Sequence, residues 1–319
     1  MELSKEKLLW MYQKMVEIRQ FELKVDELFK KNMIWGTCHL YVGEEATAVG
    51  ACAALNPDDY ITSTHRGHGH TIAKGADIKK MMAELLGKET GYCKGRGGSM
   101  HIVDVSTGNL GANGIVAGGI PIATGAALAS KLKKDNKVTI CFFGDGAANE
   151  GVFHESLNMA GLWKLPVVYI CENNLYGMSN PVSKSTAVKD IAQRAESYNM
   201  PGVIVDGNDI VEVYKAVKEA VDRARRGEGA TLIESKTYRW LGHSKSDPRV
   251  YRTREEEEEW KKKDPIKRFE KYLEETTDIT KDELEEINKK VEQEIEEAYQ
   301  FAINSPDPRV EDLAKYVYA

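Results

Sequence analysis

The stretch "ICFFGDGAANEG", Ile140–Gly151, decides the fold, because an apolar run leads directly into Gly-Asp-Gly and then into a helical pattern. The run has the length and composition of a buried strand. Asp145 stands where this strand ends, which is no place for a packing residue. Gly144 and Gly146 on either side allow another group to come close to the backbone. We therefore expect a ligand site at this end of the strand.

Strands alternate with helices from Lys137 onward. The expected strands are "KVTICFF", "PVVYICE", "PGVIVDG" and "ATLIESKTY", and the expected helices span 147–163, about 189–197 and 209–226. Almost continuously apolar strands that alternate with helices predict an α/β protein with a parallel sheet covered on both faces. In the first of these helices, the spacing of Met159 and Trp163 indicates a place in the core.

Helices are expected on both sides of this core. Residues 5–31, 43–55 and 118–134 have helical patterns, "DYITST" reads as a short strand, and Lys88–Asn113 reads as a long glycine-rich functional loop. The charged stretches after Glu255 read as helices with solvated faces. We expect one domain over 1–319, made of N-terminal helices (about 1–56), an α/β core (about 57–240) and an active-site loop with C-terminal helices (about 241–319).

Composition excludes several functional classes. A net charge of -6 argues against a nucleic-acid-binding protein, whose surface is usually basic. No apolar run approaches the roughly 20 residues that cross a bilayer, so we expect no membrane partner. The first residues lack the features of a signal or transit peptide. The five cysteines are scattered and form no Cys-x-x-Cys pair. A cytoplasmic protein is expected.

Two expected strands end in side chains that suit a magnesium ion. Asp145 follows the first strand, and Asn174 follows the next one along the chain. A right-handed crossover brings both ends to the same edge of a parallel sheet, where such folds bind ligands. Carboxylate, amide and carbonyl oxygens are ligands that Mg²⁺ accepts. A site with a single carboxylate leaves the ion positive enough to bind a diphosphate as well.

The pattern "GDG", then 26 residues, then "NN" resembles that of thiamine-diphosphate enzymes. The segments "CHLYVGEEA", "HRGHG", "GRGGSMH", "GANGIVAGGIP", "ENNLYGM" and "GHSKSDPRVYRT" resemble the alpha subunit of the decarboxylating component of 2-oxo acid dehydrogenase complexes. The similarity is greatest to pyruvate and acetoin members. It implies the thiamine-diphosphate-binding fold and the cofactors thiamine diphosphate and Mg²⁺.

By this resemblance, Mg²⁺ is ligated by Asp145, Asn174 and the main-chain carbonyl of Tyr176. Gly146 and Ala147 are implied to contact the diphosphate.

The resemblance also implies residues that hold the rest of the cofactor. Arg66 matches an arginine that grips the diphosphate, for which a guanidinium fork is well suited. His65 stands where many relatives have tyrosine, as in acetoin-type subunits. Gly114 and Val116 match positions whose backbone supports the thiamine rings.

Three histidines are implied to act near the reaction. His39 and His243 match histidines close to the reactive carbon, where an imidazole transfers protons or stabilises a developing alkoxide. His68 is expected to order the active-site loop. Of the other histidines, His154 is expected to be structural, while the roles of His70 and His101 are left open.

The family resemblance implies that the chain is incomplete alone. The acid that activates the cofactor belongs to a separate beta subunit, so we expect an α2β2 heterotetramer that serves the lipoyl group of a dihydrolipoyl acetyltransferase core. The segment 242–255 is expected to be a mobile loop at the mouth of the site, with Arg249 and Arg252 available to a phosphate or a lipoyl domain. Ser244 aligns with a serine that is phosphorylated in mitochondrial relatives, but we expect it to be unmodified.

Several alternatives stay open. The substrate is acetoin or pyruvate, with branched-chain 2-oxo acids as a third possibility. A noncatalytic magnesium-diphosphate-binding subunit would keep Asp145 and Asn174 but would not need His39 or His243. A transketolase-like half chain fits the 242–255 loop less well. A nicotinamide-binding fold is disfavoured, because no Gly-x-Gly-x-x-Gly opens a helix after a strand.

Overall fold

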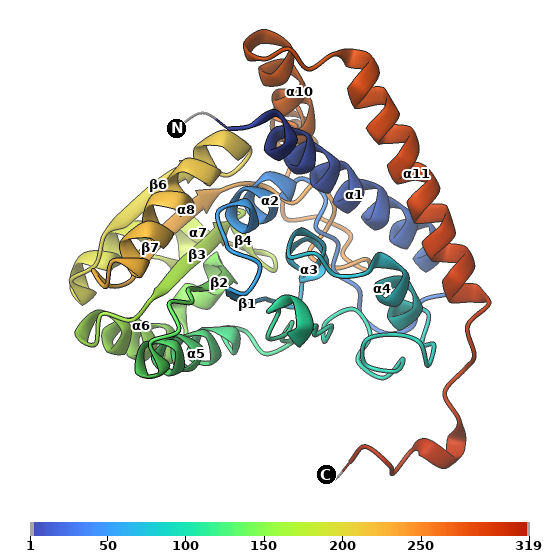
Figure 1. Cartoon of the computed structure of the whole chain (residues 1–319), viewed down its shortest axis with the longest axis horizontal. Coiled ribbons are helices and arrows are strands. Elements are labelled where there is room, and N and C mark those ends of the chain that lie inside the picture. The colour runs from blue at the N-terminus through green and yellow to red at the C-terminus, as the bar shows by residue number, and fades with distance from the viewer. Residues whose placement is uncertain (1–2, 318–319) are drawn as a thin grey trace.

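A parallel five-stranded sheet forms the centre of the molecule in the computed structural model, which describes residues 3–317 (Figure 1). The strands follow the order β1-β2-β3-β7-β6, and every neighbouring pair is parallel. They are β1 (Tyr60–Thr62), β2 (Thr139–Gly144), β3 (Val167–Asn173), β6 (Gly202–Asp206) and β7 (Thr231–Lys236), with a small antiparallel pair β4 (Tyr176–Gly177) and β5 (Asn180–Pro181) beside them. The α/β class expected from the sequence is confirmed.

Helices bury both faces of this sheet. Along β2, Ile140 and Phe142 pack into one apolar core and Cys141 and Phe143 into another, as the two-residue period of a strand requires. Helices α2 (Glu45–Ala53) and α8 (Ile210–Arg225) belong to the first core, while α5 (Gly119–Lys133) and α6 (Gly151–Leu162) belong to the second. Burial on both sides explains why the central strands are apolar at nearly every position.

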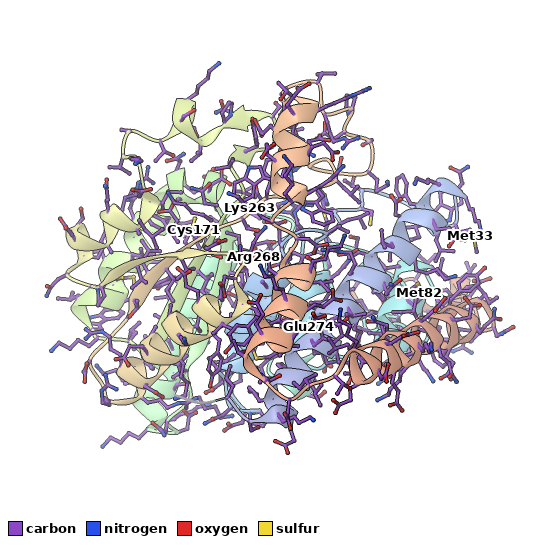
Figure 2. The ribbon with its side chains drawn as sticks, turned by 90° about the horizontal axis from the view of Figure 1, so that it is seen from above. Met33, Met82, Cys171, Lys263, Arg268 and Glu274 are labelled. Atoms are coloured by element: carbon purple, nitrogen blue, oxygen red, sulfur yellow. The ribbon has the colours of Figure 1, made fainter. Side chains whose placement is uncertain are left out.

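The remaining helices extend the first core at the two ends of the chain. The C-terminal helix α11 (Lys281–Ile303) lies beside α1 (Lys5–Lys30) and α4 (Ile78–Leu85), and the buried Met82 marks the contact with α4 (Figures 1 and 2). A capping box between Thr280 and Glu283 starts α11. The other helices are α3 (His68–Ala73), α7 (Val182–Ser185), α9 (Arg254–Lys261) and α10 (Pro265–Thr276), with 3-10 turns η1 (Val105–Thr107), η2 (Asp145–Asn149), η3 (Ile191–Tyr198) and η4 (Val310–Asp312).

The structure corrects the expected helix 147–163. Its first residues form the 3-10 turn η2, and α6 begins only at Gly151, because Glu150 has an extended backbone. Met159 and Trp163 are 38% and 39% exposed, so their expected place in the core was wrong. The buried face of α6 is formed instead by Phe153, Ser156, Leu157 and Ala160.

The glycine-rich segment between Lys88 and Asn113 contains only the short turn η1. Part of it wraps around a buried carboxylate, because Glu84 accepts the backbone N–H groups of Cys93, Gly95, Gly97 and Gly98. These amides therefore bind a carboxylate of the chain itself. Within residues 3–317, no helix is both long enough and apolar enough to span a bilayer.

Candidate active site

The carboxyl ends of three neighbouring strands meet at one edge of the sheet. Gly144 on β2 pairs with Glu172 on β3, and Asn173 on β3 pairs with Lys236 on β7. A cavity of about 360 Å³ opens at this edge. Its lining contains every residue that the sequence predicted for the cofactor and the metal: His65, Arg66, Gly114, Val116, Asp145, Gly146, Ala147, Asn174, Tyr176 and His243, together with His39.

Asp145 lines the cavity and has an unsatisfied side-chain oxygen. The residue is buried, and its Oδ2 has no hydrogen-bond partner within residues 3–317. Burial raises the pKa of Asp145 to about 6, although Arg239 and nearby backbone N–H groups oppose this shift. A Cβ on Gly177 would lie 3.8 Å from Oδ2 and 3.4 Å from the Cα of Gly146. The turn after β2 is therefore packed against the segment that follows β3.

The other two predicted metal ligands converge on one cationic group. Nη1 of Arg239 donates to Oδ1 of Asn174 at 2.9 Å and to the carbonyl oxygen of Tyr176 at 2.6 Å. The positive guanidinium thus lies between two oxygens that the sequence assigned to Mg²⁺. With the unpaired Asp145 oxygen nearby, the donor set is three hard oxygens, which fits a magnesium ion.

The backbone around Tyr176 is held in an unusual conformation. Leu175 and Met178 have φ values of 76° and 57°, in the left-handed region that side chains of this size rarely adopt. Such outliers concentrate at functional sites, where the surrounding structure maintains them. Here they lie on either side of the residue whose carbonyl accepts a hydrogen bond from Arg239.

Glu44 connects the metal side of the cavity with the expected phosphate side. Its Oε1 accepts a hydrogen bond from Nδ2 of Asn174 at 3.0 Å, and its Oε2 lies 3.7 Å from Nε of Arg66. Burial and the nearby Glu172 raise the pKa of Glu44 to about 7. The Nη atoms of Arg66 donate to the carbonyls of Leu40 and His243, so this arginine joins three segments of the cavity wall.

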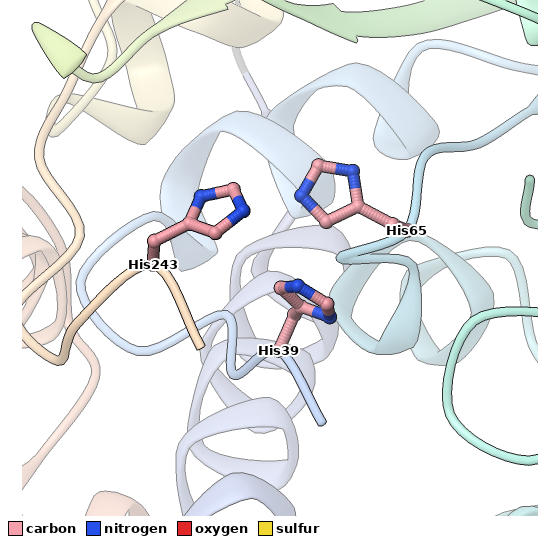
Figure 3. Close-up of side chains that lie close together, drawn as sticks. All are labelled: His39, His65 and His243. Atoms are coloured by element: carbon pink, nitrogen blue, oxygen red, sulfur yellow. The ribbon is translucent and has the colours of Figure 1, made fainter. Parts of the chain in front are cut away.

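Three imidazoles converge at the other end of the cavity. His39 follows α1, His65 follows β1 and His243 follows β7, and their ring centroids are 4.5 to 5.3 Å apart (Figure 3). Burial, together with the charge of Arg66, lowers their pKa values to about 3 for His39, 2 for His65 and 4 for His243. These histidines are therefore uncharged at neutral pH.

His68 does not line the cavity. Both of its ring nitrogens are engaged, Nδ1 with Glu22 and Nε2 with Ser99, each at 3.0 Å. This arrangement ties the glycine-rich loop to helix α1, which agrees with a positioning role. His70 is also buried, with hydrogen bonds to Ser63 and Glu172.

The polar network behind the site includes residues that the sequence reading missed. Arg239 is fully buried just beyond β7, whose end lies next to that of β3. Ligands of such folds bind at the carboxyl ends of the strands, and this rule predicted Asp145 and Asn174. Arg239 follows a third strand end, so the sequence could have identified it in the same way. Glu172 also stands at a strand end, directly before the last residue of β3, so the same rule applies to it. Glu44 carries no comparable signal, because it lies at the start of α2 and not at a strand end.

The segment 242–253 is extensively hydrogen-bonded in the structure. Asp247 accepts hydrogen bonds from the His243 backbone N–H and the Tyr251 hydroxyl, and Tyr251 in turn accepts one from Arg239. Arg252 is buried and bonded to Glu257 and to backbone carbonyls, and Arg249 is also paired with Glu257. The expectation that Arg252 is available to a partner is therefore wrong for this conformation, whereas Arg249 stays partly exposed.

A parallel sheet whose strand ends surround an oxygen-lined cavity defines an α/β protein that binds its ligand at the carboxyl edge. More narrowly, the chain belongs to the dehydrogenase E1 component family, whose sequence model matches residues 13–311. The family expected from the motifs is thus confirmed.

Several relatives are similar over nearly the whole chain. The alpha subunit of acetoin:2,6-dichlorophenolindophenol oxidoreductase from Bacillus subtilis is 54% identical over 99% of this chain and 95% of its own. The subunit of the same name from Cupriavidus necator is 46% identical with the same coverage. The pyruvate dehydrogenase E1 component subunit alpha from Porphyra purpurea is 42% identical over 99% of this chain and 94% of its own.

Proposed function

We propose that this chain is the alpha subunit of a thiamine-diphosphate-dependent dehydrogenase component. It cleaves acetoin or oxidatively decarboxylates pyruvate, and it passes the acetyl unit to the lipoyl group of a dihydrolipoyl acetyltransferase. The two acetoin-type relatives are the more similar of the three described above, which favours acetoin as the first substrate to test.

One observation carries this proposal: the unpaired, buried oxygen of Asp145 belongs to a residue that lines the same cavity as Asn174 and Tyr176, whose oxygens converge on Arg239. These three groups would ligate Mg²⁺, which in turn would bind the diphosphate. Gly146 and Ala147 lie at the same strand end, so their backbone would contact the phosphates. A Cβ at Gly144 would meet no atom within 4 Å, so this side of the cavity has room for a ligand.

The histidines support an enzyme over a binding module. Thiamine diphosphate supplies the nucleophilic carbon and the electron sink when it is bound. The protein's own contribution at that end is three uncharged imidazoles, each able to donate one hydrogen bond and accept another. Nδ1 of His39 is buried and has no partner within residues 3–317, so it is available to a substrate hydroxyl or carbonyl. A noncatalytic subunit would not need this arrangement.

The mouth of the cavity supports dependence on a beta subunit. Three apolar side chains that line it, Ile115, Val116 and Met178, are 74%, 51% and 66% exposed. Among the described residues the lining contains two carboxylates, Asp145 and Glu172, and Glu172 is already bonded to Tyr41 and His70. A partner that covers the apolar rim and brings its own glutamate would complete the site. We accordingly propose an α2β2 heterotetramer and, as before, a cytoplasmic location.

The test is a reductase assay with the purified chain, with and without its beta subunit, using an artificial electron acceptor. Acetoin, pyruvate and 2-oxobutyrate are compared, and a branched-chain 2-oxo acid is included for the remaining alternative. The proposal expects turnover only when both subunits, thiamine diphosphate and Mg²⁺ are present. Full activity of the chain alone would contradict the dependence on a partner.

A further inference from the structure

The histidines of this chain fall into two groups. His68, His70, His101 and His154 each have a hydrogen bond from at least one ring nitrogen to another group of the protein. The ring nitrogens of the other three, His39, His65 and His243, have no such partner within residues 3–317. Two of these free atoms, Nδ1 of His39 and Nε2 of His65, are completely buried. Unsatisfied buried nitrogens are costly, so their presence at one place indicates a ligand.

The three free imidazoles form a compact cluster. One ring nitrogen from each histidine can be chosen so that the three nitrogens lie within 4.8 Å of one another. The rings point towards a common centre (Figure 3). A zinc ion bound at about 2.0–2.1 Å holds its nitrogen ligands roughly 3.3 Å apart. The nitrogens must therefore approach by no more than about 1.5 Å, a distance that small rotations of the side chains cover.

We propose that His39, His65 and His243 bind a late first-row divalent metal ion such as Zn²⁺ when the cavity holds no thiamine diphosphate. This three-histidine cluster is then an inhibitory metal site, because the ion occupies the space in which the cofactor and the substrate react. Nitrogen ligands select zinc, cobalt, nickel or copper over magnesium, whereas the oxygens of Asp145, Asn174 and Tyr176 select magnesium. One cavity thus offers two metal sites of different chemistry.

The surroundings of the cluster set its expected strength. Its histidines are uncharged at neutral pH, so no proton has to leave before the metal binds. However, within residues 3–317 none of them donates a hydrogen bond to a carboxylate or carbonyl. Metal sites that lack such supporting hydrogen bonds are weaker by about 10- to 100-fold. Arg66 also places a positive charge nearby. We therefore expect reversible binding, with an affinity on the order of micromolar, as suits an inhibitory site better than a structural one.

The experiment is a titration of the full chain, free of cofactor, with Zn²⁺ by calorimetry and with Co²⁺ by visible absorption. The wild-type chain is expected to bind one equivalent and to give the absorption of four-coordinate Co²⁺. His65→Tyr and His243→Gln remove one ligand each and are expected to weaken binding by tenfold or more. His154→Gln is the matched control, because His154 is an exposed histidine outside the cluster.

A second arm adds thiamine diphosphate with Mg²⁺, which is expected to displace the cobalt and abolish its absorption. Circular dichroism shows whether each variant is folded; if His65→Tyr does not fold, His243→Gln in the 242–253 segment decides. Equal zinc affinity in the wild type and in a folded cluster variant would overturn the proposal, and so would cobalt absorption that survives saturation with cofactor. The zinc and cobalt titrations use no cofactor and no turnover, so they stay decisive if the proposed function fails; the displacement arm alone rests on the proposed cofactor binding.

Discussion

The side chain of Asn174 is fixed from both sides, by Glu44 and by Arg239. Arginine can only donate hydrogen bonds, so the atom that faces Nη1 of Arg239 at 2.9 Å must be Oδ1. The opposite atom, Nδ2, donates to Glu44 at 3.0 Å. Glu44 thereby keeps the oxygen of Asn174 on the side of Arg239, where a magnesium ion would have to compete with the guanidinium for it.

Glu44→Leu removes this acceptor and is expected to weaken the Mg²⁺-dependent binding of thiamine diphosphate by roughly tenfold or more. A hydrogen bond to a charged group contributes about 1.5–3 kcal/mol, and its loss frees the amide to rotate. Glu44→Gln keeps an acceptor oxygen and serves as the matched control, for which we expect a smaller loss. Calorimetric titration of both variants gives the comparison. Unchanged affinity in a folded Leu variant would exclude a positioning role for Glu44.

Gly144→Ala tests whether the Gly-Asp-Gly turn leaves space for a ligand. An added Cβ would meet no atom within 4 Å, and the backbone at Gly144 has a φ of -87°, so the cofactor-free protein should keep its melting temperature. The methyl group would nevertheless occupy space beside Asp145 and reduce cofactor affinity by tenfold or more, about 1.4 kcal/mol. Gly151→Ala, just beyond the same turn, is the control and should leave binding unchanged.

We expect the ionised side chain of Asp145 to lower the folding stability of the cofactor-free protein while it favours binding of the cofactor with magnesium. Its pKa is raised from 3.8 to about 6, so the folded, cofactor-free protein favours the protonated acid. The stability that this group contributes is therefore complete below about pH 4 and is lost as the pH rises through 6. Asp145→Asn removes that loss and should raise the free energy of unfolding at pH 8 by on the order of 1–3 kcal/mol. Urea denaturation at pH 4 and pH 8 measures this difference.

The same substitution is expected to abolish magnesium-dependent cofactor binding, because the carboxylate is the charged ligand of the proposed site. A variant that is less stable than the wild type at pH 8, or that still binds the cofactor with magnesium, would contradict this account of Asp145.

Features of the fold and the site that follow from local sequence patterns could be predicted, and features that depend on tertiary packing could not. Almost continuously apolar strands that alternate with helices, and the side chains just after them, predicted the sheet, its covered faces and the convergence of Asp145 and Asn174. These features follow from local sequence and from the handedness of crossovers. The prediction that Met159 is buried was wrong, because a helical period does not tell which of two apolar faces of α6 is covered.

The network behind the cavity could not be predicted in the same way. Tyr41 and Glu44 lie in "CHLYVGEEA" and Glu172 opens "ENNLYGM". Neither segment shows by itself that Tyr41 bonds to Glu172 or that Glu44 bonds to Asn174. The low pKa values of the three imidazoles likewise result from burial and from the charge of Arg66. Such properties arise only after the chain has folded.

His39→Gln is expected to separate catalysis from binding. Nδ1 of His39 has no hydrogen-bond partner among the described residues, so its loss should leave the fold and cofactor affinity intact. If His39 handles a proton of the substrate, turnover by the complex of both subunits should fall by about 10²- to 10⁴-fold. His154→Gln provides a control with unchanged turnover. Wild-type turnover in the His39 variant would favour the noncatalytic alternative.

The most direct test of the central claim is the affinity of thiamine diphosphate for the assembled alpha and beta subunits, measured by calorimetry in excess Mg²⁺ and again in EDTA. If Asp145, Asn174 and the carbonyl of Tyr176 hold a magnesium ion that binds the diphosphate, affinity should fall at least 100-fold in EDTA, and Asp145→Ala should bind as weakly in either buffer. Equally tight binding by the wild type with and without magnesium would contradict the account.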